Sequence, residues 1–138
     1  MGIGRSFVFV ICVVLLSCNK DSVSEYLYNY LKEPVDAPAS YYIIDMHGCD
    51  NCIENNLQFL GQNRVRVTLI FVGKINSKKW HSIIKKLGEN YIILYDEERM
   101  AGRMELALSS PLLVVTSKGK VIMKRNIKDS QLDILLEL

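Results

Sequence analysis

The stretch that decides the fold is YYIIDMHGCDNCIE, residues 41–54, in which an apolar run ends in two cysteines three positions apart. We expect residues 41–45 to form a strand and the segment from Cys52 onward to form a helix. Cys49 then sits at the helix N-terminus, where free N–H groups and the helix macrodipole stabilise a thiolate. Cys52 lies one turn further in. The outer sulfur can attack a substrate disulfide, and the inner sulfur can resolve the mixed disulfide.

Two other uses of this cysteine pair remain open. Cysteines at this spacing can form an inert short disulfide, or they can supply half of a four-ligand zinc site. The zinc interpretation lacks its second half, because no cysteine pair follows downstream and His81 falls in a helical pattern far along the chain. We therefore predict redox chemistry and no metal site.

Length and charge limit the classes of function. The chain has 138 residues, which is enough for one domain with a hydrophobic core and too short for two ordinary domains. Its 17 Lys and Arg residues against 15 Asp and Glu residues give a net charge of +2. Such a charge provides no basic field of the kind that nucleic acid binding requires, so no nucleic acid partner is expected.

The N-terminus has the pattern of an export signal. Arg5 supplies positive charge, and residues 7–16 are an apolar run of signal-peptide length that is too short to span a bilayer comfortably. The run ends in Leu15-Leu16-Ser17-Cys18, which resembles the lipobox of bacterial lipoproteins, where cleavage leaves the cysteine as a lipid-bearing N-terminus. Residues 1–17 are then a signal peptide, and lipid on Cys18 holds the protein at a membrane. An uncleaved anchor or an ordinary secretory signal remains open, and either one still exports the domain.

Export and processing of the N-terminus would also give the four cysteines different roles. Cys12 is lost with the signal and Cys18 carries lipid, so Cys49 and Cys52 remain as the only free pair. Structural disulfides persist outside the cytosol, so the compartment alone does not distinguish a catalytic pair from a structural one.

Hydrophobic periodicity predicts the other elements. A capping-box pattern at residues 22–25 starts a helix whose aromatic stripe we expect to pack on the domain rather than to bind a partner. The helix that follows the cysteines is expected to end at Gly61. The remaining elements are a strand at 64–72, a helix from Ser77 to Gly88, a strand at 91–95, a helix at 96–108, a hairpin of 112–116 and 121–124, and a helix at 128–138.

This order of elements resembles the thioredoxin-like fold, and its exported versions in particular, from about Ser40 to the C-terminus. The expected class is α/β, a thioredoxin-like three-layer sandwich whose central mixed sheet is flanked by helices, with an extra helix at the N-terminus. Residues 18–39 are then the lipid-anchored linker and N-terminal helix, and residues 40–138 the thioredoxin-like domain.

Two motifs carry the resemblance: the cysteine pair at the end of the first strand, and the Ser110-Pro111 step before the hairpin. The resemblance implies that Cys49 is the nucleophile and Cys52 the resolving thiol. It also implies that Ser110 and Pro111 form the substrate-side wall. In that family the proline is cis and faces the cysteines, and the backbone before it pairs with the substrate chain.

The residues around the thiols depart from the usual pattern of that family. Gly48 replaces an aromatic residue, and Asp50-Asn51 replaces Gly-Pro between the cysteines. The buried carboxylate that many thioredoxins carry six residues before the nucleophile falls at Ile43, so that proton relay is absent unless Asp45 substitutes for it.

Charges near the nucleophile are expected to act in opposite directions on its ionisation. Asp50 should oppose formation of the Cys49 thiolate, whereas the helix terminus and a protonated His47 should favour it. We therefore take His47, Asp50 and Asn51 as supporting residues of the site.

The sequence predicts a lipid-anchored thiol–disulfide oxidoreductase of the bacterial envelope, in the periplasm or at the cell surface, that exchanges disulfides with exported proteins. It needs no dissociable cofactor, because the electrons reside on the Cys49–Cys52 pair, and an unidentified redox partner must reset that pair. Two other classes remain open. One is a binding module with the same fold and an inert disulfide. The other is a copper-handling domain, since Met46 and His47 add soft ligands for Cu(I) beside the two thiols.

Overall fold

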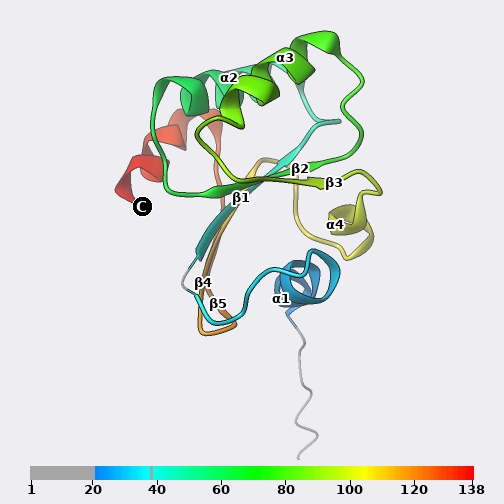
Figure 1. The fold of residues 1–138 in the computed structure, drawn as a ribbon, viewed down its shortest axis with the longest axis vertical. Coiled ribbons are helices and arrows are strands. Elements are labelled where there is room, and N and C mark those ends of the chain that lie inside the picture. Colours follow the sequence, from blue (N-terminus) through cyan, green and yellow to red (C-terminus); the bar gives the residue numbers. More distant parts are fainter. Residues whose placement is uncertain (1–20, 38) are drawn as a thin grey trace, which may run out of the picture.

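The chain folds into a mixed sheet with helices on both faces (Figure 1). The computed structural model describes residues 21–37 and 39–138, so the predicted signal peptide and Cys18 lie outside the described residues. The five strands lie in the order β3-β2-β1-β4-β5, with β1, β2 and β3 parallel and β4 and β5 joined by antiparallel pairings. Their bounds are Ala39–Asp45 (β1), Thr68–Val72 (β2), Ile93–Asp96 (β3), Leu112–Ser117 (β4) and Lys120–Asn126 (β5). This is the topology of the thioredoxin-like fold, and it confirms the predicted fold class.

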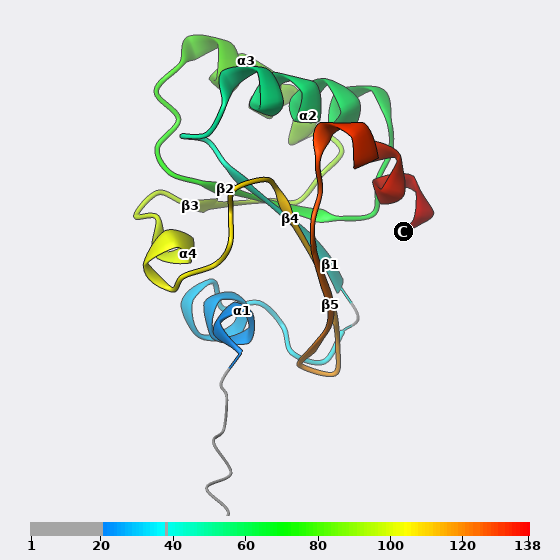
Figure 2. The ribbon, with the colours of Figure 1, turned by 180° about the vertical axis from the view of Figure 1, so that it is seen from behind.

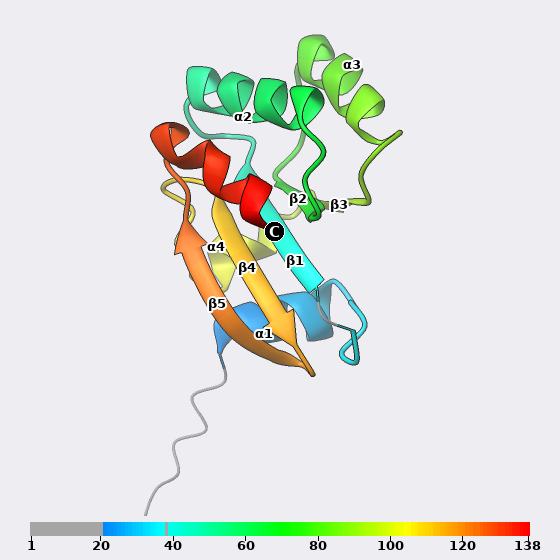
Figure 3. The ribbon, with the colours of Figure 1, turned by 90° about the vertical axis from the view of Figure 1, so that its left-hand side faces the viewer.

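The central strand β1 is buried on both faces because its side chains alternate between two hydrophobic clusters. Tyr42 and Ile44 point to one cluster, and Tyr41 and Ile43 point to the other. The first cluster is covered by three helices, with the C-terminal helix beside α2 (Figures 2 and 3). These helices are α2 (Asp50–Gln62), α3 (Lys78–Leu87) and the 3-10 helix η2 (Asp129–Glu137).

The opposite face is covered by the N-terminal segment and a short helix. This layer comprises α1 (Ser22–Ser24), the π-helix η1 (Glu25–Tyr30) and α4 (Met100–Arg103). Val23, Tyr26 and Leu27 are buried against the sheet, which confirms that the aromatic stripe packs on the domain.

A buried carboxylate at the end of β3 holds this layer together. Asp96 is fully buried and accepts a hydrogen bond from the Tyr26 hydroxyl at 3.0 Å. It also accepts from the backbone N–H groups of Met100, at 2.9 Å, and Ala101, at 2.8 Å. One side chain therefore ties the N-terminal segment and the start of α4 to the sheet.

Several predicted element bounds are wrong for physical reasons. The first helix is capped by the side chain of Asp21 and not by a Ser22–Glu25 capping box. Gly61 lies inside α2, which ends at Gln62. The predicted helix at 96–108 shrinks to α4 because Asp96 belongs to β3, and Arg99, with φ 57°, cannot continue a right-handed helix. The closing helix, predicted at 128–138, is a 3-10 helix from Asp129 to Glu137, and its Leu136 is 53% exposed.

The hairpin between β4 and β5 turns where it was predicted, but the step that opens it has a different geometry. Lys118 and Gly119 both have positive φ, as a two-residue hairpin turn requires. The expected cis Ser110–Pro111 bond is wrong, since none of the peptide bonds among the described residues is cis. The trans form is the intrinsically favoured isomer of an X–Pro bond.

Among the described residues, no helix has both the length and the apolar character needed to cross a membrane.

Candidate active site at Cys49 and Cys52

The two cysteines lie where the chain leaves the central strand and enters α2. Cys49 is the N-cap residue of α2, and its Sγ accepts a hydrogen bond from the backbone N–H of Cys52 at 3.4 Å. Both cysteines are free thiols. Cys49 is exposed, whereas Cys52 is half-buried. The helix terminus therefore presents one thiol to the surroundings and keeps the other one turn behind it.

The environment shifts the two thiol pKa values in opposite directions. Hydrogen bonds from the Cys52 side chain and from the backbone N–H groups of Cys52 and Asn51 lower the pKa of Cys49. Burial and the negative charge of Asp129 oppose this shift. The hydrogen bond to Cys49, burial, and the charges of Cys49 and Asp129 raise the pKa of Cys52 to about 11. Cys49 is therefore the sulfur that ionises first and can act as a nucleophile.

A pocket adjoins both thiols and has an apolar wall with a polar rim. The wall is built from Ile44, Ile53, Leu108 and Pro111. The rim is formed by Asp45, Gly48, Ser109, Ser110, Lys128 and Asp129.

Ser110 and Pro111 border this pocket together with both cysteines, but the loop that carries them has internal partners. The side-chain amide of Asn126 donates to the carbonyl of Ala107 at 2.8 Å and to that of Ser110 at 3.0 Å. The Ser110 carbonyl, which the family resemblance assigns to pairing with a substrate chain, therefore has only its second lone pair free.

The predicted supporting residues are dispersed. The His47 ring packs over Gly73, which has φ 93° and leaves no room for a Cβ, and it does not line the pocket. Asn51 contributes its backbone N–H to Cys49. Asp50 is exposed in the first turn of α2, where a negative charge suits the helix macrodipole. The charge of Asp129 also opposes ionisation of Cys49.

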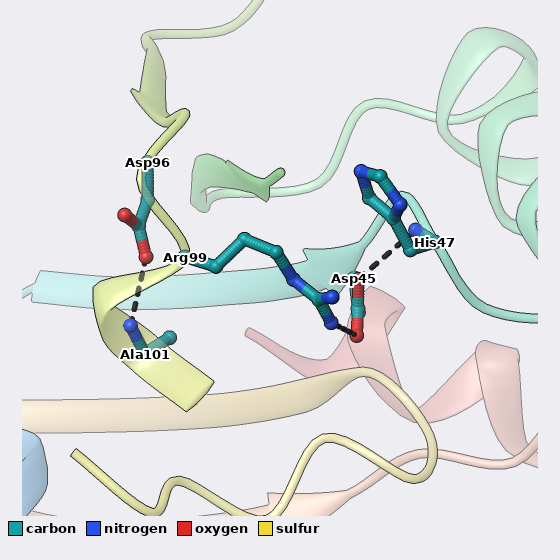
Figure 4. A network of polar contacts seen from close by, with 5 residues as sticks. All are labelled: Asp45, His47, Asp96, Arg99 and Ala101. Carbon is teal, nitrogen blue, oxygen red and sulfur yellow. Dashed lines mark hydrogen bonds and ion pairs between the residues drawn. The ribbon is translucent and has the colours of Figure 1, made fainter. Parts of the chain in front are cut away.

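Asp45 borders the pocket, but both of its oxygens are already engaged (Figure 4). One oxygen accepts from the backbone N–H of His47 at 2.9 Å, and the other accepts from Arg99 at 3.0 Å. The ion pair is partly exposed, so its own contribution to stability is small. Asp45 thus holds the turn that leads to Cys49.

The described residues bring no three His, Cys, Asp or Glu side chains close enough together to hold a metal ion. Met46 is packed in the core, and neither Met46 nor His47 borders the pocket that the thiols line. The four soft ligands considered for Cu(I) therefore do not converge.

Sequence reasoning missed a polar cluster behind Cys52. The amide nitrogen of Asn55 donates to Asp129 at 2.9 Å, and that of Asn56 donates to the Cys52 carbonyl at 2.8 Å and to Asp129 at 3.4 Å. The fully buried Asn56 also accepts from the Tyr42 hydroxyl. A signal existed for Asn56, since it falls at helical spacing on the apolar face of α2. Asp129 comes from a remote element, and no local pattern marks it.

Comparisons with known proteins give matches at the level of solved structures only. No protein-family model matches the chain, and no curated protein matches it either. One similar structure is a secreted Mycobacterium tuberculosis disulfide oxidoreductase homologous to E. coli DsbE, with 16% identity over 73% of this chain and 81% of that one and a TM-score of 0.46. Another is StoA from Bacillus subtilis, with 14% identity, coverage of 77% and 86%, and a TM-score of 0.46.

Fold and site together define a thioredoxin-like domain with a cysteine pair at the start of α2.

Proposed function

We propose that the protein is a thiol–disulfide oxidoreductase that works through Cys49 and Cys52. The observation that carries this proposal is the unequal pair at the start of α2. Cys49 is exposed, accepts the Cys52 N–H at 3.4 Å and has a lowered pKa, whereas Cys52 is half-buried with a pKa raised to about 11. An inert disulfide requires no such division of roles.

The reaction uses only the two sulfurs. The Cys49 thiolate attacks one sulfur of a substrate disulfide and releases the other as a thiolate, which leaves a mixed disulfide. Cys52 then attacks the Cys49 sulfur, so the substrate leaves reduced and the Cys49–Cys52 disulfide remains. Run in reverse, the same steps oxidise a substrate dithiol. No dissociable cofactor takes part, and a separate redox partner must reset the pair.

The predicted setting is the bacterial envelope. The lipobox-like end of the N-terminal apolar run supports export and lipid attachment at Cys18, which would hold the domain at a membrane in the periplasm or at the cell surface. The substrates in that setting are disulfides or thiols of other exported proteins. The apolar wall and polar rim of the pocket suit a peptide segment of such a protein.

A trapping experiment tests the proposal in cells. Cys52→Ser is expected to accumulate mixed disulfides through Cys49, because the intermediate forms but the thiol that releases it is missing. Cys49→Ser is the matched control and is expected to trap almost nothing. Non-reducing gels followed by mass spectrometry of the adducts provide the measurement. The proposal is wrong if neither variant traps a partner and the wild-type pair resists thioredoxin-strength reductants, which is the behaviour of a binding module.

A further inference from the structure

The second half of the exchange reaction needs a proton acceptor for Cys52. Only the thiolate of Cys52 can attack the mixed disulfide, yet the hydrogen bond with Cys49, burial, and the charges of Cys49 and Asp129 raise the pKa of Cys52 to about 11 in the reduced pair. Formation of the mixed disulfide removes the hydrogen bond to the Cys49 thiolate and its charge, whereas burial and the charge of Asp129 still raise the pKa of Cys52. At neutral pH the step is therefore faster if a neighbouring group takes up the Cys52 proton as the new bond forms.

Besides the two thiols, three titratable residues line the pocket, Asp45, Lys128 and Asp129, and the buried Tyr42 hydroxyl bonds to Asn56. Asp45 of β1 already accepts from His47 and Arg99. The Tyr42 hydroxyl of β1 donates a hydrogen bond to the Asn56 side-chain oxygen, and burial followed by the charge of Asp129 raises the pKa of Tyr42. Lys128 is a cation with donors only. Asp129 is the remaining carboxylate, and it lines the same pocket as Cys52.

The structure holds Asp129 in place through the helix that carries Cys52. Asn55 donates to one carboxylate oxygen at 2.9 Å, and Asn56 donates to the other at 3.4 Å. The same Asn56 nitrogen lies 2.8 Å from the Cys52 carbonyl. Asn56 cannot easily reorient, because it is fully buried and its oxygen is bound by the Tyr42 hydroxyl. One fixed amide thus links the carboxylate to the residue that must lose a proton.

We propose that Asp129 accepts the proton of Cys52, directly or through one water, when Cys52 resolves the mixed disulfide. This inference rests on the proposed function, since it assumes that Cys52 resolves. The Cys52 proton passes to the carboxylate, the Cys52 sulfur bonds to the Cys49 sulfur, and the bond from Cys49 to the substrate sulfur breaks. The substrate leaves as a thiolate, reduced by two electrons in total, while the Cys49–Cys52 pair is oxidised.

A proton acceptor and a fixed negative charge at Asp129 predict opposite changes in the rate of resolution when the carboxylate is removed. The negative charge of Asp129 raises the pKa of both thiols, so Asp129→Asn lowers both values. If Asp129 acts only as a charge, the variant has more Cys52 thiolate and resolves faster. If Asp129 accepts the proton, the variant has more thiolate and still resolves more slowly.

The experiment uses the full chain carrying Cys12→Ser and Cys18→Ser, so that only Cys49 and Cys52 react. One equivalent of the aromatic disulfide dithiobis(nitrobenzoate) is mixed with the reduced protein, and release of the coloured thiol is followed by stopped flow. Attack by Cys49 releases the first thiol, and resolution by Cys52 releases the second. Cys52→Ser identifies the first phase, and Asp133→Asn, an exposed carboxylate on the same helix, is the matched control.

Asp129→Asn is expected to slow the second phase by about tenfold or more while the first phase stays as fast or becomes faster. Asp129→Glu should recover part of the rate, and Asp133→Asn should behave as the wild type. In a Cys49→Ser background, ultraviolet titration of the Cys52 thiolate should shift to lower pH in Asp129→Asn.

A second phase that is unchanged or faster in Asp129→Asn overturns the inference but leaves the proposed function standing. An unshifted Cys52 titration also overturns it, because the carboxylate then does not face the thiol. A wild-type protein without any second phase refutes the proposed function itself, and the inference falls with it.

Discussion

The Tyr26–Asp96 contact offers a quantitative test of how the N-terminal segment is held to the sheet. The buried Asp96 carboxylate accepts three hydrogen bonds: one from the Tyr26 hydroxyl and two from the backbone at the start of α4. Asp96→Asn replaces one acceptor oxygen with an NH₂ group, so at least one buried donor loses its partner. That loss costs about 1–3 kcal/mol, and the remaining bonds weaken because the acceptor is no longer charged.

We therefore expect Asp96→Asn to lower the free energy of unfolding by about 3 kcal/mol. Tyr26→Phe, which removes a single bond to a charged acceptor, should lower it by about 1.5–2 kcal/mol. The double variant should cost less than the sum of the two, because the changes share one interaction. Glu97→Gln is the control, since it makes the same carboxylate-to-amide change at the adjacent exposed residue.

Urea unfolding followed by the fluorescence of Trp80, the single tryptophan, measures these values. Trp80 packs in the cluster on the other side of the sheet, so its signal reports unfolding of the whole domain. The reasoning is refuted if Asp96→Asn unfolds at the same urea concentration as Glu97→Gln and the wild type.

Three further predictions concern the thiols, the anchor and the buried tyrosines. Iodoacetamide at about pH 7 should label Cys49 well before Cys52, whose pKa is raised to about 11; equal labelling by mass spectrometry contradicts the pKa order. Cys18→Ala should release the protein from membranes or block its processing, and a processed variant that stays membrane-bound in cell fractionation counts against the lipobox. Burial is the largest cause that raises the pKa of Tyr26, Tyr41 and Tyr42 above the ordinary 10.0. The free energy of unfolding should therefore be retained below about pH 10 and fall above it, where these tyrosines ionise in the unfolded chain only. Urea midpoints that stay constant to about pH 11 would argue against this.

The parts of the fold that sequence could predict are those in which a local pattern and tertiary burial agree. The run at 41–45 lies in the central strand β1. The helix after Ser77 forms because its apolar face is continuous, and Gly88 caps its end. The prediction of a helix at 96–108 was wrong because the burial of Asp96 and the positive φ of Arg99 depend on distant contacts. Helical spacing alone contains no information about those contacts.

The same distinction applies to the site. The cysteine pair is visible in the sequence because its chemistry depends on a spacing within one helical turn. Asp129 lies 73 residues beyond Asn56 and meets it only because η2 packs beside α2. The position of His47 also depends on a distant residue, because its ring packs over Gly73 in space that a Cβ there would occupy. Side chains that long-range packing brings to the thiols were therefore beyond prediction.

The reduction potential of the Cys49–Cys52 pair tests the central claim most directly. The full chain carrying Cys12→Ser and Cys18→Ser is equilibrated in thiol–disulfide buffers of known potential, and the oxidised fraction is read by mass spectrometry after alkylation. We predict a single two-electron transition between about −120 and −270 mV, the range of catalytic pairs. A potential below about −300 mV would mark the pair as a structural disulfide and contradict the account.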